Sequence, residues 1–509
     1  MKDILRICDK FKLSIGNIYL IDGKSIKNTK LCMNDILYDL QGNRFKVKGI
    51  EMFRAFIDMD PNDMPLGILL GLLDGVEVEG YILSHEKIEL NFIYCNHPLY
   101  KDQVDEDYRE EYQTAGLNSP CALFSYEDLK EGKLSLFGEK ISGLTIYRGW
   151  MMKPDMYNFF YDKLEEKGII LINTPEEYKR YHTLPGWYNE FKEFTPESVW
   201  ENTGTLESAL DLTIGLSGSY IVKDYVKSRK HEWYDACYIQ NITDTTNVKK
   251  TIGNFIERQG DSLVGGIVLR KFVKLKPIGY HEKSGMPISE EYRVFVYAGR
   301  VMIIENYWRT ENKNIISDDE FTWIFTLIDK IRSNFVTMDL GRTEDGKLIV
   351  MELGDGQVSG LQEISPERFY PTFNPDYIDE STNIGFSFPP GAVIMADDPA
   401  SDLDIEKARK LSSCIKTNQE LAEVYARVDN KYKWVSSDVD DYDEGTEEYK
   451  NARLISDEWR YEEHKLRVKI FKILEEEGIE IPEDGQITVL APFMEKYGYR
   501  DGRGWWVKY

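Results

Sequence analysis

The sequence predicts a multidomain protein of mixed class, α+β and α/β. Its 509 residues suffice for about two to four domains, each with its own core. Short strands separated by turns fill residues 1–88, helices alternate with strands over 89–205, and a strand–turn–strand pattern dominates 206–375. Residues 376–509 show mostly helical spacing of apolar residues. We therefore expect four domains with these boundaries.

The first segment, residues 1–88, is predicted to be all-β. Apolar, β-branched runs at Ile18–Ile21, Phe45–Ile50 and Gly67–Leu70 are separated by Asp-Gly and Gly-Asn turn sequences. Three stretches of this segment resemble the second domain of elongation factor Tu and its relatives: Lys48–Arg54, Asp63–Leu70 and Glu79–Leu83.

In that factor the domain is a small closed barrel that holds the aminoacylated end of tRNA. This chain has Leu70–Leu73 where the family usually has Leu-Leu-Arg-Gly, so the arginine is missing. A tRNA role remains open, but the resemblance favours a barrel that docks a protein or peptide partner or stabilises the chain. We also expect the barrel to fold on its own.

The second segment, residues 89–205, is predicted to be a Rossmann-like α/β half. Met156–Leu164 has helical spacing, and the buried-type strand Gly168–Ile172 follows it. No G-x-G-x-x-G sequence follows a strand, so a dinucleotide is not expected here. Arg148 and His182 are the polar residues expected to face a substrate. For His182 the alternative is a histidine of the core or of a helix cap.

Acidic residues gather on the predicted hairpin Phe335–Leu361. Its turn places Asp339 beside Glu352 across the two strands, and Asp355 follows at the strand end. Such carboxylates suit Mg²⁺ or Mn²⁺, a metal that proteins often share with a nucleotide phosphate. The alternative is a solvated hairpin with scattered acids.

The order of the strands before this hairpin resembles the ATP-grasp superfamily. A strand ending in Lys223, the apolar strand Ile267–Val273 and a strand carrying Arg293 precede Asp339 and Glu352. The resemblance is closest to the R2K clade, once catalogued as a domain of unknown function. With Arg148–Met151, Leu171–Glu176 and Tyr181–Pro185 it extends over residues 94–363.

The resemblance implies a site that holds ATP between two α+β halves. Lys223 then neutralises the α- and β-phosphates, and Arg293 contacts the γ-phosphate, so these two are the candidate catalytic residues. Arg270 and Lys271 become candidates for the phosphate or adenine side, and Phe272 and Val273 for the adenine slot. Asp339 and Glu352 match the Mg²⁺ ligands. The family's usual third ligand is an Asn at the position of Gly354, so Asp355 is the candidate to replace it.

The function implied by the resemblance is an ATP-dependent ligase. ATP activates a carboxylate as an acyl phosphate, and an amine or thiol then attacks it; the substrate is unknown, with a peptide or protein among the candidates. Two alternatives stay open: phosphotransfer to a small molecule on the same fold, and a nucleotide-binding interaction module without ligase activity. The barrel or the C-terminal helices then contact a partner.

Composition excludes several other classes. A net charge of −25 argues against a nucleic-acid surface or an anionic-membrane surface, because both need basic patches. Six cysteines without C-x-x-C spacing predict reduced thiols in the cytoplasm. The charged N-terminus does not resemble a signal peptide, and the longest apolar run, Pro65–Leu73, is too short to span a bilayer.

Overall fold

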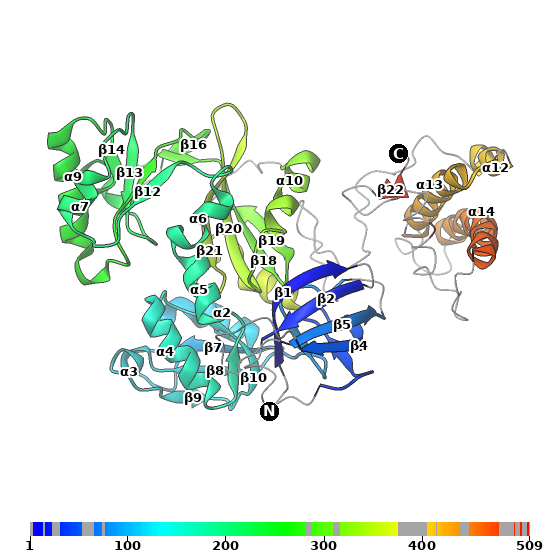
Figure 1. Cartoon of the computed structure of the whole chain (residues 1–509), viewed down its shortest axis with the longest axis horizontal. Coiled ribbons are helices and arrows are strands. Elements are labelled where there is room, and N and C mark those ends of the chain that lie inside the picture. Colours follow the sequence, from blue (N-terminus) through cyan, green and yellow to red (C-terminus); the bar gives the residue numbers. More distant parts are fainter. Residues whose placement is uncertain are drawn as a thin grey trace. The chain divides into compact units, whose positions relative to one another are not determined.

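The computed structural model describes residues 4–13, 16–22, 31–52, 66–73, 77–280, 287–308, 316–374, 405–413, 415–437, 447–477, 493, 499–500 and 506–507. The chain divides into two compact units, Met1–Ser387 and Phe388–Tyr509 (Figure 1). The barrel, the α/β half and the two sheets that follow all belong to the first unit. Within the described helices, no segment is long and apolar enough to cross a membrane.

The N-terminal segment is a closed six-stranded barrel, as predicted. Its strands follow the order β1-β2-β5-β4-β3-β6, and β1 pairs with both β2 and β6 in antiparallel fashion. Register shifts interrupt β1 and β4, and such bulges help a short sheet to curve and close. The strands are β1 (Ile4–Leu13), β2 (Gly16–Ile21), β3 (Ile36–Tyr38), β4 (Arg44–Met52), β5 (Leu66–Leu72) and β6 (Ile82–Ser84).

The second segment is the expected α/β half. Its sheet has the order β11-β10-β7-β8-β9, in which β9 alone runs antiparallel to its neighbour. All six residues of β10 are buried, as in a strand covered on both faces. The strands are β7 (Asn91–Cys95), β8 (Cys121–Phe124), β9 (Leu136–Gly138), β10 (Gly143–Arg148) and β11 (Ile169–Leu171).

Helices accompany this sheet and lead to the next. A reciprocal pair of hydrogen bonds between Thr174 and Glu177 begins α5 directly after β11. The helices are η1 (Glu106–Tyr108), α2 (Arg109–Ala115), α3 (Tyr126–Lys130), α4 (Pro154–Glu165), α5 (Pro175–His182) and α6 (Leu184–Phe191).

A four-stranded sheet of order β12-β15-β13-β14 follows, and it packs with α7 and α9. Its strands are β12 (Ser198–Trp200), β13 (Tyr220–Lys223), β14 (Tyr238–Ile239) and β15 (Val268–Lys271). The helices are α7 (Leu206–Asp211), η2 (Lys230–Glu232), α8 (Trp233–Ala236), α9 (Thr245–Gln259) and η3 (Gly260–Ser262). A small ribbon of β16 (Pro277–Tyr280) and β17 (Pro287–Ser289) leads onward.

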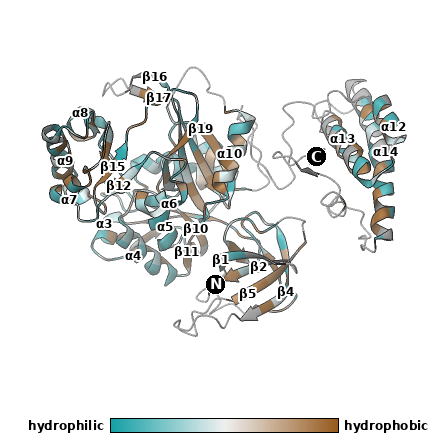
Figure 2. Cartoon of the chain, turned by 45° about the horizontal axis from the view of Figure 1, so that its top comes forward, coloured by the Kyte–Doolittle hydropathy of each residue, from teal (hydrophilic) through white to brown (hydrophobic). Residues whose placement is uncertain are grey.

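A second antiparallel sheet has the order β19-β18-β20-β21. Every residue of β18 and β20 is buried, and Figure 2 shows hydrophobic residues concentrated on the strands of this sheet and of the barrel. Its elements are β18 (Glu291–Tyr297), β19 (Arg300–Asn306), α10 (Asp318–Ile328), β20 (Phe335–Arg342), β21 (Leu348–Asp355), α11 (Pro366–Phe369) and η4 (Tyr370–Phe373).

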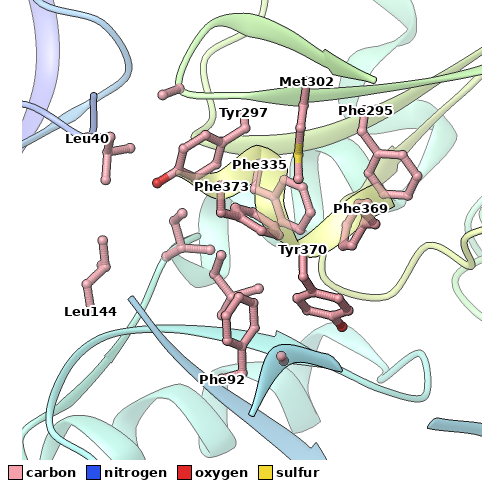
Figure 3. Close-up of a cluster of buried hydrophobic side chains, with 14 of the residues drawn as sticks. Leu40, Phe92, Leu144, Phe295, Tyr297, Met302, Phe335, Phe369, Tyr370 and Phe373 are labelled. Atoms are coloured by element: carbon pink, nitrogen blue, oxygen red, sulfur yellow. The ribbon is translucent and has the colours of Figure 1, made fainter. Parts of the chain in front are cut away.

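One aromatic cluster joins the barrel, the α/β sheet and this second sheet (Figure 3). Leu40 comes from the barrel and Phe92 from β7, while Tyr297 and Phe335 come from β18 and β20. The ring of Phe373 lies 5.5 Å from Phe92 and 5.2 Å from Tyr297. The barrel also has a core of its own, which includes Leu5, Phe45 and Ile68, so its independent folding stays a prediction.

The second unit is mostly helical, as predicted. It contains α12 (Ile405–Ser413), α13 (Asn418–Ser437) and α14 (Glu447–Glu476), with a short pair of β22 (Tyr499–Arg500) and β23 (Trp506–Val507). Reciprocal hydrogen bonds between Thr417 and Glu420 begin α13 separately from α12.

Candidate functional site

Four charged residues lie at the facing parts of the two sheets. Lys223 ends β13, while Arg293, Asp339 and Glu352 lie on β18, β20 and β21. In the strand register Arg293 is directly opposite Asp339, and Asp339 is directly opposite Glu352. The predicted cross-strand neighbours Asp339 and Glu352 are therefore present.

Arg293 and Asp339 form a buried bidentate pair. Nε donates to Oδ1 at 2.8 Å and Nη2 donates to Oδ2 at 2.7 Å, while Nη1 donates to the carbonyl oxygen of Gly360 at 2.7 Å. Burial disfavours the charged guanidinium, but the Asp339 carboxylate outweighs it and raises the pKa of Arg293. The guanidinium is therefore charged and held in one geometry.

Lys223 and Glu352 form the ion pair that connects the two sheets. The Lys223 Nζ donates to the Glu352 Oε1 at 2.7 Å. The lysine side chain is 9% exposed and the glutamate side chain 44%. Burial works against the Glu352 carboxylate, but Lys223 prevails and lowers its pKa. The Oε2 atom makes no hydrogen bond to the residues that the structure describes, so it can accept a ligand.

The sequence prediction missed Lys230, which lies seven positions after Lys223, in η2. Burial disfavours its ammonium, but Glu291, Tyr307 and Glu352 outweigh this effect and raise its pKa. The residue keeps solvent-exposed surface, and Lys230 forms no ion pair with the described part of the chain. The polar loop directly after the strand lysine was the available signal.

His182 lies at the edge of the same group of charges, at the end of α5. It is 5% exposed, and its ring centroid lies 4.7 Å from that of Tyr178. Burial lowers the pKa of His182 to about 4, so the imidazole is neutral near pH 7, and Glu352 and Lys223 are among the charges that act on it. It makes no hydrogen bond to any described residue, which leaves its ring nitrogens open to a ligand.

Arg270 is placed differently from the prediction. Its Nη2 donates to Thr195 Oγ1 at 2.8 Å and to the carbonyl oxygen of Met351 at 2.6 Å, and the residue is 6% exposed. Burial lowers the pKa of Arg270 to about 10. Its donors bind protein oxygens, so Arg270 ties the first sheet to β21 rather than offering its charge to a phosphate.

Lys271 is the last residue of β15, and Phe272 and Val273 follow it. The Lys271 side chain is 42% exposed, and its Nζ lies 4.0 Å from Glu197. The ring of Phe272 lies 5.0 Å from Tyr238, which in turn stacks on Trp233, and Val273 is half-buried. These positions do not decide the expected adenine contacts, which stay a prediction.

Asp355 is not brought to the acid pair. It lies three residues after Glu352 and therefore on the opposite face of β21. Its carboxylate accepts hydrogen bonds from Asn173 Nδ2 at 2.7 Å and from the Gln357 N–H at 3.0 Å, and burial raises its pKa to about 7. Among the described residues, no three His, Cys, Asp or Glu side chains form a possible metal site. In this structure Asp355 therefore lies apart from the Asp339–Glu352 pair, and it is bound by Asn173 and Gln357 instead.

Arg148 is likewise buried rather than facing a substrate. It is 1% exposed, and its Nε donates to Glu111 Oε2 at 2.9 Å. Its Nη1 donates to the carbonyl oxygens of Gly356 at 2.6 Å and Ser359 at 2.9 Å. Arg148 thus fixes the loop after β21, whose Gly360 carbonyl also binds Arg293.

The two facing sheets, with basic residues around an acid pair, have the architecture of an ATP-grasp domain. Residues 212–372 match the family model "ATP-grasp domain, R2K clade family 3". The predicted resemblance is confirmed. No curated protein matches the chain.

Similar solved structures include D-alanyl-alanine synthetase A from Vibrio cholerae O1 biovar eltor, with 12% identity and a TM-score of 0.37 over 56% of this chain and 92% of that chain. Another is the RimK domain protein ATP-grasp from Sphaerobacter thermophilus, with 11% identity and a TM-score of 0.37 over 56% of this chain and 97% of that chain. The family assignment depends on the match of residues 212–372.

Proposed function

We propose that this protein is a cytoplasmic ATP-dependent ligase that activates a carboxylate as an acyl phosphate and joins it to an amine or thiol. The observation that carries the proposal is the group formed by Lys223, Arg293, Asp339 and Glu352 within an ATP-grasp domain. An acid pair surrounded by fixed cations matches the needs of a metal-bound triphosphate.

The residues present fit Mg²⁺ or Mn²⁺. Glu352 offers a half-exposed carboxylate with Oε2 open, and each Asp339 oxygen accepts a single hydrogen bond from Arg293. Because a carboxylate oxygen has two lone pairs, Asp339 keeps ligand capacity while paired. When bound, the metal neutralises charge on the phosphates.

The basic side chains would hold the phosphates. Lys223 and the exposed Lys230 approach from the first sheet and its loop, and Arg293 from the second. Arg293 is already oriented by Asp339 and Gly360, so it needs little reorganisation to oppose charge on the transferred phosphoryl group. Phe272 with Tyr238 and Trp233 supplies an aromatic wall for the adenine.

The reaction has two steps. A substrate carboxylate oxygen attacks the γ-phosphorus and ADP leaves; an amine or thiol then attacks the acyl carbon, loses its proton and expels phosphate. The protein positions the reactants and balances charge, without a covalent bond to the enzyme. The neutral imidazole of His182 is available to contact the substrate. The substrate can be a peptide or protein, held with the barrel or the helical unit.

The test uses the full chain with Mg·ATP, hydroxylamine and pools of amino acids and peptides. Release of ADP together with a hydroxamate supports an acyl phosphate. A phosphorylated product without hydroxamate would indicate phosphotransfer to a small molecule, and Mg·ATP binding without turnover would indicate an interaction module. Asp339→Asn is the inactive control, and the proposal fails if that variant forms hydroxamate at the wild-type rate.

A further inference from the structure

We propose that a small oxyanion, a phosphate or a carboxylate group, binds in a cavity between the barrel and the second sheet. The cavity has a volume of about 290 Å³, room for a small metabolite. Its walls come from β1, from residues 78–81, from the β18–β19 turn and from the end of α10. It is separate from the ATP-grasp charges, because none of Lys223, Arg293 and Glu352 lines it.

Two cations from different segments meet in this cavity at Tyr81. The Nζ of Lys10, on β1, lies 4.8 Å from the centre of the Tyr81 ring and donates to the carbonyl oxygen of Val78 at 2.9 Å. The Nη1 of Arg332, after α10, donates to the Tyr81 hydroxyl at 2.9 Å and to the carbonyl oxygen of Asp329 at 2.9 Å. Both residues keep solvent-exposed surface although the Lys10 ammonium packs on Tyr81, so a ligand can reach them.

Neither cation forms an ion pair within the described ranges of the chain. Burial lowers the pKa of Lys10 to about 8, and the charge of Arg332 contributes to this shift. Two like charges at one cavity repel each other, and a bound anion would relieve the repulsion. The unbalanced donors are an ammonium and a guanidinium, which bind phosphate and carboxylate oxygens strongly.

The acidic residues at the cavity do not cancel its preference for an anion. Glu79 is paired with Arg300, and Asp9 accepts the backbone N–H of Lys10 at 2.8 Å. Asp9 and Asp329 are both exposed, so solvent screens them. Glu77 and Asp39 also act on Lys10. Glu77 is exposed and so screened by solvent, and Asp39 accepts hydrogen bonds from the backbone N–H groups of residues 41, 43 and 79.

The walls of the cavity are held by a close backbone contact. Gly80 has φ +69°, and a Cβ there would lie 3.0 Å from Asn334 Oδ1 and 3.1 Å from the Cα of Ala298. The neighbouring Tyr81 N–H donates to Asn334 Oδ1 at 2.7 Å. These contacts hold residues 80 and 81 of the N-terminal segment against Ala298 and Asn334. An oxyanion bound by Lys10 and Arg332 would therefore link two segments whose relative position is already fixed by these contacts.

The experiment measures the melting temperature of the full chain during titration with inorganic phosphate or with malonate, at constant ionic strength and with saturating Mg·ADP. We expect saturable stabilisation by at least one of the two anions, and the stronger one identifies the phosphate or carboxylate source. Lys10→Gln and Arg332→Gln should each weaken binding of that anion roughly tenfold or more. Lys330→Gln, which removes a nearby charge outside the cavity, should not.

Lys10→Arg and Arg332→Lys keep the positive charges and should therefore retain anion binding. They serve as the controls if a glutamine variant folds poorly. The proposal is overturned if neither anion stabilises the wild type, or if the response survives in both glutamine variants. It is also overturned if Lys223→Gln alone abolishes the response, because the anion would then bind among the ATP-grasp charges. The outcome does not depend on ligase activity.

Discussion

Glu352→Gln should separate metal binding from nucleotide binding. The substitution keeps the shape of the side chain but removes the charge that faces Lys223 at 2.7 Å. The carboxylate is 44% exposed, so its ion pair contributes about 0–1 kcal/mol to the free energy of unfolding, and the fold should persist. Loss of the Glu352 carboxylate as a metal ligand should reduce the Mg²⁺-dependent affinity for ATP by about 10–100-fold, or about 1.5–3 kcal/mol.

The two parts of the affinity should change in opposite directions. Without the carboxylate, Lys223 loses its partner and becomes available to a phosphate, so the affinity for ATP in EDTA should stay equal or rise. Calorimetric titrations of ATP with and without Mg²⁺ measure both quantities. Glu344→Gln is the matched control, because it removes the same charge from the exposed turn of the same hairpin. An unchanged Mg²⁺ dependence in Glu352→Gln would refute the ligand assignment.

Three further results are expected. Arg148→Met leaves Glu111 buried without a cation and should lower the free energy of unfolding by about 3–5 kcal/mol in urea titrations; a change confined to substrate KM would contradict its structural role. Deletion of residues 1–88 uncovers the shared aromatic core and should give an aggregated or much less stable chain by calorimetry; a soluble, cooperatively melting product would refute this. As the pH rises from about 4 to 7, wild type should lose stability relative to Asp355→Asn, because burial raises the pKa of the folded-state Asp355 carboxyl to about 7 from an ordinary 3.8 and the fold therefore favours its neutral form. The loss should be at most about 4 kcal/mol in the free energy of unfolding, measured by melting curves at each pH. A constant difference between the two proteins across this range would refute the prediction.

The acid pair could be predicted from the resemblance to ATP-grasp proteins, but not from the turn alone. The register beside the turn pairs Arg342 with Leu348 and Leu340 with Val350, and without interruption it would place Asp339 opposite Met351. A register shift between Asp339 and Leu340 brings Glu352 opposite Asp339 instead. Strand alternation does explain why Asp355 lies apart, since it stands an odd number of residues after Glu352 and so on the other face. The short strands of residues 1–88 could be predicted from their turns, whereas closure into a barrel was predicted from the resemblance.

The contacts of Arg148 and Arg270 could not be predicted from strand periodicity. Both arginines lie on strands in the expected segments, but each is buried by a partner distant in sequence: Arg148 by the loop after β21, and Arg270 by residue 195 and the β21 backbone. Periodicity shows which face a residue occupies and not which segment covers that face. The basic loop residue Lys230 was missed for a related reason, because the carboxylates whose charge acts on it lie on β18 and β21.

If the proposed function holds, the ion pairs of the site imply that metal and nucleotide raise each other's affinity. Lys223 cannot hold a phosphate with the same bond that it makes to Glu352 Oε1. A phosphate that takes over Lys223 leaves Glu352 with both oxygens available to a metal, and a metal on Glu352 in turn releases Lys223. Such coupling is reciprocal in free energy, so each ligand must raise the affinity for the other by the same factor. Arg293 is different, since its bond to Asp339 leaves lone pairs for a metal and can persist. The coupling is therefore carried by Lys223 and Glu352, the pair that joins the two sheets.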